Sequence, residues 1–401
     1  MKKIVTLLLV AAMLVTSIAM LAGCGGETAN EDFKIGFIFL HDENSTYDKN
    51  FLDAAKAATE ELGLSAEQVI FKTNIPEGNE CYEAAADLAD QGCDIVFANS
   101  FGHEPYILKA AKEFPEVDFC HATGTTAHTE KVANFHNAFA SIYEGRFLAG
   151  IAAGLKLNEM IDEGKITAEE AKMGYVGAFT YAEVISGYTS FYLGAKSVCP
   201  SVTMEVQFTG SWYDEALEKE AATKLLSNKC VLISQHADSM GAPTACENAN
   251  VPNVSYNGST KDACPNTFIV SSRIDWAPYF KYIINQRQKG EAIAYDWCEG
   301  FEAGSVALTE VNEQAAAEGT QAAIEDAKAK LIAGEIKVFD TNNFTVEGKK
   351  LESYLADVDT DANYEKDTEV IKDGYFHESE YRSAPYFDLQ IDGITLLNSM
   401  F

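Results

Sequence analysis

The sequence lacks the short motifs that mark many catalytic sites. It contains no GxSxG, HExxH or phosphate-binding P-loop, and no GxGxxG follows a strand-like segment. The 7 histidines are scattered, no two cysteines form CxxC, and no Cys or His pair has zinc-ligand spacing. We therefore expect no metal, no cofactor and no enzymatic activity, although missing motifs are weak evidence against an enzyme.

Basic residues are few. The chain has 30 Lys and Arg against 61 Asp and Glu, which gives a formal net charge of −31 at pH 7. This charge repels nucleic acids and anionic lipid head groups, so neither is an expected partner, and an acidic surface also favours solubility. We expect a monomer.

Long apolar runs are also scarce, and the one present lies at the N-terminus. A basic start, an apolar run from Ile4 to Ala22 and the ending Leu21-Ala22-Gly23-Cys24 form a secretory signal. It resembles a bacterial lipoprotein signal, in which Cys24 is lipidated and becomes the first mature residue. The alternatives are an ordinary signal peptide or a membrane-spanning helix, for which the run is barely long enough. We expect a signal peptide over 1–23, a lipidated tether over 24–32, and anchoring on the extracytoplasmic face of the cell membrane.

Eight cysteines remain after Cys24, and an even number in an exported chain permits disulfides. Cys93 and Cys230 stand at the start of strand-like runs, where cysteine often acts as a small hydrophobe. We expect mostly free, buried thiols with room for one disulfide.

From Phe33 onward, strand-like apolar runs alternate with amphipathic helical stretches, and this rhythm restarts near Lys172. Alternation of this kind predicts βαβ units and parallel sheets, here in two doubly wound, Rossmann-like lobes of α/β class. A long helix is expected from Ile142, and the strand over 267–271 could return to the first lobe. The expected strands are 34–40, 69–72, 94–98, 117–120, 172–179, 202–208, 230–234 and 267–271.

The lobe boundaries follow from where this rhythm changes. Lobe 1 is expected over 33–137 plus about 272–302, and lobe 2 over about 138–271 plus about 303–345. Residues 346–401 are irregular and acidic, and we expect them to form a peripheral segment.

Ligands of open α/β sheets bind beyond the carboxyl ends of the strands, so each strand end supplies candidates. Tyr47, Phe101, Trp212, His236 and Asp238 all follow expected strands, and aromatic rings beside polar groups suit a flat, polar-edged ligand. Structural roles compete with this interpretation: Tyr47 and Trp212 are equally plausible in a core, and a core position is more typical of Phe101. His236 and Asp238 favour a site, because two polar groups directly follow a buried strand.

Asp214 follows the strand over 202–208 and stands directly before Glu215-Ala216-Leu217-Glu218. A side-chain oxygen at this position favours a helix N-cap over a ligand contact.

Four segments carry a resemblance to a known family: Ala98–Gly102, Lys109–Pro115, Ile142–Gly150 and Gly334–Asp340. They resemble the basic membrane protein family, the substrate-binding lipoproteins of ABC importers, and the resemblance runs from about Phe33 to Gly348. It implies a type I periplasmic-binding-protein fold, two lobes joined by hinge crossovers, and an ABC permease in the membrane as partner.

The stretches Ser211–Asp214, Gln235–Ser239 and Asp275–Tyr279 are most similar to family members that bind purines. The resemblance implies a purine nucleoside or purine base as ligand, with aromatic rings against the base and carboxylates on the ribose. With the strand-end residues, the expected ligand-binding set is Tyr47, Asp48, Ser100, Phe101, Trp212, His236, Asp238, Asn257, Asp275 and Trp276.

Some residues depart from the family pattern and leave the ligand open. Asn257 stands where nucleoside binders usually carry Asp, and Ser272 or Arg273 where they carry Lys. Ser45 and Lys49 replace a Trp and a His of the purine-binding members. The alternatives are another small polar solute such as a sugar, an extracytoplasmic nucleoside-cleaving enzyme, or a sensor or adhesin that partners a receptor.

Overall fold

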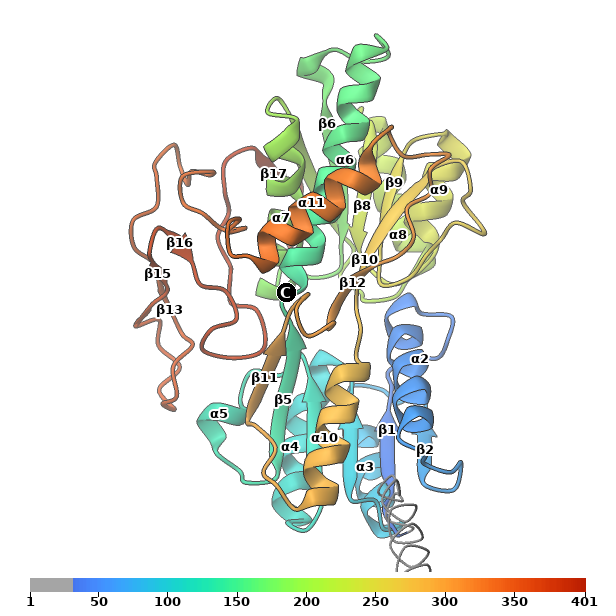
Figure 1. The fold of residues 1–401 in the computed structure, drawn as a ribbon, viewed down its shortest axis with the longest axis vertical. Coiled ribbons are helices and arrows are strands. Elements are labelled where there is room, and N and C mark those ends of the chain that lie inside the picture. The colour runs from blue at the N-terminus through green and yellow to red at the C-terminus, as the bar shows by residue number, and fades with distance from the viewer. Residues whose placement is uncertain (1–31) are drawn as a thin grey trace, which may run out of the picture.

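The computed structural model describes residues 32–401, which fold into two lobes stacked end to end (Figure 1). The expected signal peptide over 1–23 lies outside the described residues, as does the tether up to residue 31 with Cys24. No helix within 32–401 has both the length and the apolar character needed to cross a bilayer.

The first lobe is built on a six-stranded parallel sheet in the order β11-β5-β4-β3-β1-β2. Successive side chains point to opposite faces, so Phe37 and Phe97 join one buried cluster while Ile38 and Val96 join another. Its strands are β1 (Ile35–Ile38), β2 (Val69–Lys72), β3 (Ile95–Ala98), β4 (Asp118–Ala122), β5 (Phe135–Ala140) and β11 (Asp296–Glu299).

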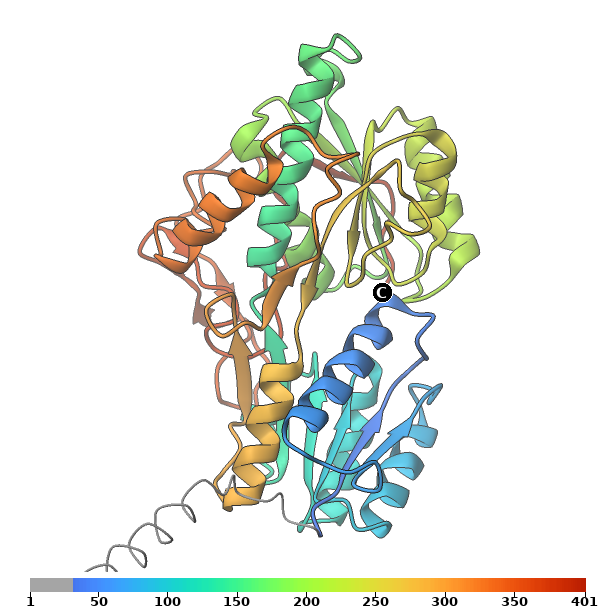
Figure 2. The ribbon, with the colours of Figure 1, turned by 45° about the vertical axis from the view of Figure 1, so that its right-hand side comes forward.

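Helices cover both faces of this sheet, which explains why its central strands β1 and β3 are apolar throughout. α2 (Thr46–Glu61) packs beside α10 (Ala277–Lys289), and α3 (Asn79–Asp90) packs beside α4 (Glu104–Glu113) (Figures 1 and 2). Two short helices, η1 (Phe101–His103) and α5 (Ala127–Glu130), complete the lobe.

The second lobe has a seven-stranded sheet in the order β12-β10-β9-β8-β6-β7-β17, parallel except for the antiparallel pair β10–β12. Its strands are β6 (Lys172–Gly177), β7 (Thr203–Phe208), β8 (Leu232–His236), β9 (Asn253–Tyr256), β10 (Phe268–Ile274), β12 (Val306–Leu308) and β17 (Ile394–Leu396). The accompanying helices are α6 (Ile142–Asp162), η2 (Ala168–Glu170), α7 (Ala182–Val198), α8 (Glu215–Ser227), α9 (Gly241–Ala249) and α11 (Thr320–Ile332).

α6 and α7 approach each other closely at two glycines. A Cβ on Gly150 would stand 2.0 Å from the carbonyl oxygen of Phe191, and one on Gly194 would stand 2.0 Å from that of Phe147. Any larger residue there would push the helices apart. This packing fixes α6, which begins directly after the chain leaves β5, against the second lobe.

The chain crosses between the lobes three times: from β5 to α6, from β10 to α10, and from β11 to β12. The strand expected over 267–271 is present as β10. The expectation that it returns to the first lobe is wrong, because β10 pairs with β9 and β12 in the second sheet. The return is made by α10 and β11 instead. Three neighbouring crossings of the chain between the lobes form a hinge.

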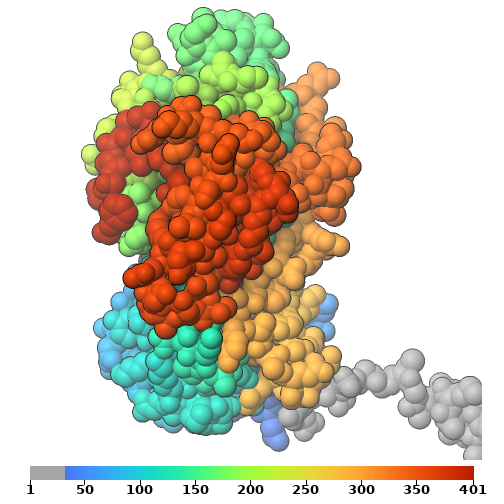
Figure 3. All heavy atoms as spheres, turned by 90° about the vertical axis from the view of Figure 1, so that its left-hand side faces the viewer, coloured from blue at the N-terminus to red at the C-terminus, as the bar shows by residue number. Residues whose placement is uncertain are grey.

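Residues 346–401 are not wholly peripheral. They form two small ribbons, and then β17 pairs with β7 as the edge of the second sheet. Ser383 also hydrogen-bonds Asp296 on β11 of the first lobe, and Figure 3 shows this segment lying over one side of both lobes. The ribbons consist of β13 (Leu355–Ala356) with β14 (Thr368–Glu369) and β15 (Ile371–Lys372) with β16 (Tyr375–Phe376).

The eight cysteines between Cys81 and Cys298 are all free thiols in the described chain. All but Cys298 are buried, as expected for cysteines that act as small hydrophobes.

Candidate ligand-binding site

A cavity of about 350 Å³, part of it open to solvent, lies between the two lobes. It is formed where strands of both sheets end, the place at which α/β sheets bind ligands. The lining residues are Leu40, His41, Tyr47, Asp48, Ser100, Phe101 and Thr123 from lobe 1, and Glu183, Trp212, His236 and Asp238 from lobe 2.

Seven of the ten residues expected from the sequence come together in this cavity. Four are contributed by lobe 1 and three by lobe 2, so the set converges only because the lobes close on each other. The seven are Tyr47, Asp48, Ser100, Phe101, Trp212, His236 and Asp238.

On the lobe 1 side, Asp48 is held by the protein itself. Its carboxylate accepts hydrogen bonds from the backbone N–H of His41 (3.1 Å) and from Asn99 Nδ2 (2.7 Å), and it lies 3.3 Å from His41 Nδ1. Burial opposes ionisation of Asp48, but these hydrogen bonds hold its pKa below the usual value. The hydroxyl of Tyr47 is also occupied, because it donates to the carbonyl oxygen of Asn99 at 2.7 Å.

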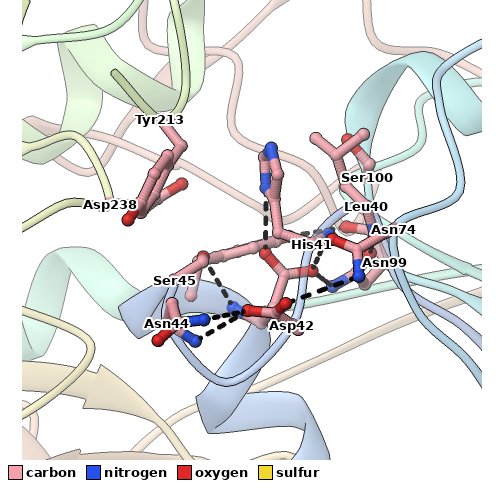
Figure 4. Close-up of polar contacts among 12 residues, drawn as sticks. Leu40, His41, Asp42, Asn44, Ser45, Asn74, Asn99, Ser100, Tyr213 and Asp238 are labelled. Atoms are coloured by element: carbon pink, nitrogen blue, oxygen red, sulfur yellow. Dashed lines mark hydrogen bonds and ion pairs between the residues drawn. The ribbon is translucent and has the colours of Figure 1, made fainter. Parts of the chain in front are cut away.

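Figure 4 shows the loop after β1, where Leu40, His41, Asp42 and Asn44 form a dense set of polar contacts. Asp42 accepts from the backbone N–H and the side chain of Asn44, which closes the turn before α2. These hydrogen bonds hold the loop that forms this part of the cavity wall.

On the lobe 2 side, the acidic groups are buried but nearly unpartnered. Asp238 is 5% exposed, and across residues 32–401 its carboxylate accepts no hydrogen bond. Burial, and then repulsion from Asp48 and other carboxylates, raises its pKa well above the usual value. Glu183 has one neighbour, His236 Nε2 at 3.4 Å, and burial raises the pKa of Glu183 to about 7. These two carboxyl groups have hydrogen-bonding capacity free for a ligand.

Aromatic rings border the cavity from both lobes. Trp212 contacts Phe179 edge to face at 5.1 Å between ring centroids, and its half-buried ring faces the cavity. Phe101 of lobe 1 stacks on Tyr181 of lobe 2 at 5.2 Å, which places an aromatic contact across the mouth. Rings with accessible faces beside carboxyl groups suit a planar ligand with polar edges.

Asn257 does not line the cavity. It follows β9 with a left-handed backbone (φ 64°), is 3% exposed, and its Nδ2 has no partner in the described chain. Asn tolerates this conformation better than most residues.

Asp275 and Trp276 are structural. The carboxylate of Asp275 accepts from the backbone N–H of Ala277 (3.0 Å) at the start of α10 and pairs with Arg273 at 3.1 Å. Trp276 is 1% exposed and stacks on Phe51 at 4.4 Å in the lobe 1 core. Neither residue lines the cavity, because the chain passes from β10 to α10 at this point and both residues contact that junction.

The cavity also contains residues that were not among the candidates. Leu40, His41 and Thr123 follow β1 and β4, so the strand-end rule alone would have found them. Glu183 lies in the first turn of α7, and it gave no comparable signal. Asp214, by contrast, behaves as expected: it caps α8 by accepting from the backbone N–H of Leu217 at 2.9 Å.

Three carboxylates of the C-terminal segment lie close together. Asp359, Asp361 and Asp367 have oxygen atoms within 4.8 Å of one another on a largely exposed loop. Exposed carboxylates are ordinary solvated groups, and this cluster is not part of the cavity.

Comparison with known proteins agrees with this geometry. The sequence profile of a family described as Bmp, ABC transporter substrate-binding protein PnrA-like, matches residues 37–342. The chain belongs to this family. A solute-binding protein of an ABC transporter from Aeropyrum pernix K1 superposes with a TM-score of 0.64 at 18% identity, over 77% of this chain and 93% of the other. The fold is therefore the type I periplasmic-binding-protein fold that the resemblance implied.

Three relatives differ in what their names say they bind. A purine-binding protein of Brucella abortus is 28% identical, over 86% of this chain and 99% of its own length. A putative ABC transporter glucose-binding protein of Haloferax volcanii is 30% identical over 54% of this chain and 52% of its own length. An ABC transporter nucleoside-binding protein of Lactococcus lactis is 26% identical over 63% of this chain and 70% of its own length.

Proposed function

We propose that this substrate-binding protein captures a purine base or purine nucleoside in the cavity between its lobes and delivers it to an ABC permease. The observation that carries the proposal is the composition of the cavity. It pairs aromatic rings with carboxyl groups that the protein leaves free, which is the complement of a flat molecule with polar edges. The relative similar over almost its whole length is named as purine-binding, which supports the same ligand class.

Capture requires the lobes to close, and the contacts between them are consistent with a closed form. The backbone N–H and the hydroxyl of Thr46 in lobe 1 both donate to the carbonyl oxygen of Asp238 in lobe 2, each at 3.1 Å. These bonds join the start of α2 to the loop after β8, directly beside the cavity. Hinge motion at the three crossings would open them and admit the ligand.

We further propose that Cys24 carries lipid and holds the protein on the extracytoplasmic face of the membrane, close to its permease. A Cys24→Ser variant should leave the membrane fraction and fail to incorporate labelled fatty acid. Retention of this variant in the membrane without label would contradict a lipid anchor.

A thermal-shift screen of full-length protein in mild detergent tests the ligand, after bound solute has been removed by partial unfolding. The panel contains adenine, guanine, adenosine, guanosine, inosine, uridine, glucose and galactose. A ligand at 100 times its dissociation constant adds about 2.7 kcal/mol of stability, which raises the melting temperature measurably. Stabilisation by purines alone supports the proposal, and base against nucleoside shows whether ribose is accommodated.

A sugar is the second candidate, favoured by the glucose-binding name of one relative. Sugars also stack on aromatic rings and donate hydroxyl hydrogens to carboxylates, so the same cavity chemistry applies. A response to hexoses with none to purines would replace the purine proposal with this one. Product formation on incubation with nucleosides would instead indicate an enzyme.

A further inference from the structure

A buried arginine lies behind the lobe 2 wall of the cavity. Arg146 of α6 is 1% exposed, and it is the one Lys or Arg that is buried between residues 32 and 401. Its Nη1 donates to the carbonyl oxygen of Gln235 at 2.9 Å, and its guanidinium lies 3.3 Å from the ring centroid of Tyr256. Nε and Nη2 have no partner in this part of the chain. A buried cation is costly unless nearby acids compensate it.

His236 lies between this arginine and the cavity. Gly187 leaves the room for it, because a Cβ there would stand 3.0 Å from His236 Nδ1 and 3.6 Å from Arg146 Nε. Burial, and then the charge of Arg146, lowers the pKa of His236 well below its usual value, so the ring is neutral. Nδ1 of His236 has no hydrogen-bond partner within residues 32–401, and Nε2 faces Glu183 at 3.4 Å.

The charges on this wall do not balance. Glu183 and Asp238 both line the cavity, whereas Arg146 is the single buried cation near them. Across the cavity, Asp48 is already compensated by its hydrogen bonds to lobe 1. These two carboxylates, with Glu218 of α8 close to Asp238, exceed the charge of one cation, and burial disfavours the excess negative charge unless protons neutralise it.

We propose that the cleft binds a neutral purine together with one proton held on the Glu183–Asp238 pair, an inference that rests on the proposed function. One carboxyl group of the pair then donates to a ring nitrogen of the base, and the other accepts from an N–H. Proteins read purines by this kind of contact along the base edge combined with stacking on aromatic rings. The pair would thus recognise the alternation of acceptor and donor along a purine edge.

The other groups that face this wall come from several elements. Glu218 of α8 lies beneath the loop of Asp238, accepts from the backbone N–H of Ser239 at 3.2 Å, and has its pKa raised to about 7 by burial. Tyr175 of β6 and Tyr256 of β9 have raised pKa values and stay neutral. Asp48 and His41 face it from lobe 1. Glu218 is therefore the group whose titration must be separated from that of the pair.

The sign of the pH dependence follows from which form binds. Burial raises the pKa of both carboxyl groups, that of Glu183 to about 7, so the pair carries its proton at low pH and loses it as the pH rises. If the protonated pair is the binding form, purine affinity is constant at low pH and falls about tenfold per pH unit above the pKa of the free protein.

Isothermal titration calorimetry measures this with adenine and adenosine, which stay uncharged over the range from about pH 6 to about pH 9. Full-length protein in detergent is titrated in two buffers of different ionisation enthalpy. We expect uptake approaching one proton per ligand at the alkaline end, together with the loss of affinity. An affinity that is flat or that rises with pH overturns the proposal.

Two matched variants identify the group. Glu183→Gln keeps the shape of the side chain without its charge, which leaves Asp238 as the one lobe 2 carboxylate that lines the cavity, and its affinity should no longer depend on pH. Glu218→Gln, which lies outside the cavity lining, should keep the wild-type slope. The reverse pattern overturns the assignment to the pair. If the protein binds purines with an affinity that does not change with pH, only the shared proton is contradicted. If it binds no purine at any pH, the proposed function is contradicted as well.

Discussion

The two walls of the cleft differ in how completely their polar groups are satisfied. On the lobe 1 wall, the side chains of Asp48 and Tyr47 already make hydrogen bonds to His41 and Asn99. On the lobe 2 wall, Asp238 and Glu183 are buried with almost no partner. A buried polar group without a partner destabilises the folded protein unless something else supplies the contact. The difference indicates that the protein itself holds the carboxylate of lobe 1, whereas the carboxyl groups of lobe 2 are available to the ligand.

Substitution of Asp48 tests the lobe 1 wall, and we expect the largest effect, on the free energy of unfolding, at this position. Asp48→Ala leaves the backbone N–H of His41 and the side-chain amide of Asn99 without their acceptor. Each buried group of this kind costs about 1–3 kcal/mol, so we expect a loss of unfolding free energy of about 2 kcal/mol. Urea denaturation measures it. Unchanged stability would show that the lobe 1 wall is not held by this carboxylate.

Asp238 tests the opposite wall. Asp238→Ala should lower purine affinity at least tenfold, about 1.4 kcal/mol, because it removes a ligand partner. Its stability should not fall, since no protein group loses a hydrogen bond to the side chain. Titration calorimetry and urea denaturation of the same preparation measure both quantities. A destabilised variant with wild-type affinity would place Asp238 with Asp48 as a structural residue.

Trp212 tests the stacking surface that accompanies the carboxyl groups. Trp212→Ala should also weaken purine binding about tenfold, since base–aromatic stacking contributes about 1–3 kcal/mol per base. Trp212→Phe keeps a ring at this position and should recover part of the affinity. Equal purine affinities of the wild type and both variants would show that Trp212 only packs against Phe179 and does not contact the ligand.

Asp275 serves as a test of the boundary of the site, with the smallest expected effect. Because its carboxylate accepts from the backbone N–H of Ala277 at the start of α10, Asp275→Ala should cost about 1 kcal/mol of stability. Purine affinity should remain within about twofold, a difference of roughly 0.4 kcal/mol. A tenfold loss of affinity without destabilisation would return Asp275 to the binding set.

Much of the fold follows from the sequence, because βαβ units are encoded locally by apolar runs and amphipathic helices. The strands it did not indicate have other causes. β5 contains His136 and Asn137, polar residues that look unsuitable for a buried strand. Asn137 accepts from the backbone N–H of Ala127, and His136 pairs with Asp118. β17 is far from its partner β7 in the chain, and no local pattern identifies a pairing between residues so far apart.

The candidate site was partly predictable for a related reason. Strand ends are visible in a sequence, so residues such as Trp212 and Asp238 could be selected from their positions. The same rule also selected Trp276, because the sequence does not show whether a strand end faces a cleft or a helix junction. Arg146 appeared only within a family-like segment, since a buried charge on a helix cannot be distinguished from an exposed one before the packing is known.

A crystal structure of the protein with adenine is the most direct test of the unequal walls. We expect the base in the cleft, beside Trp212, with ring nitrogens or the amino group within about 3.2 Å of carboxyl oxygens of Asp238 or Glu183. A base whose polar atoms contact only Asp48 and Asn99 would contradict the account. So would a base that leaves the carboxyl groups of lobe 2 unpartnered.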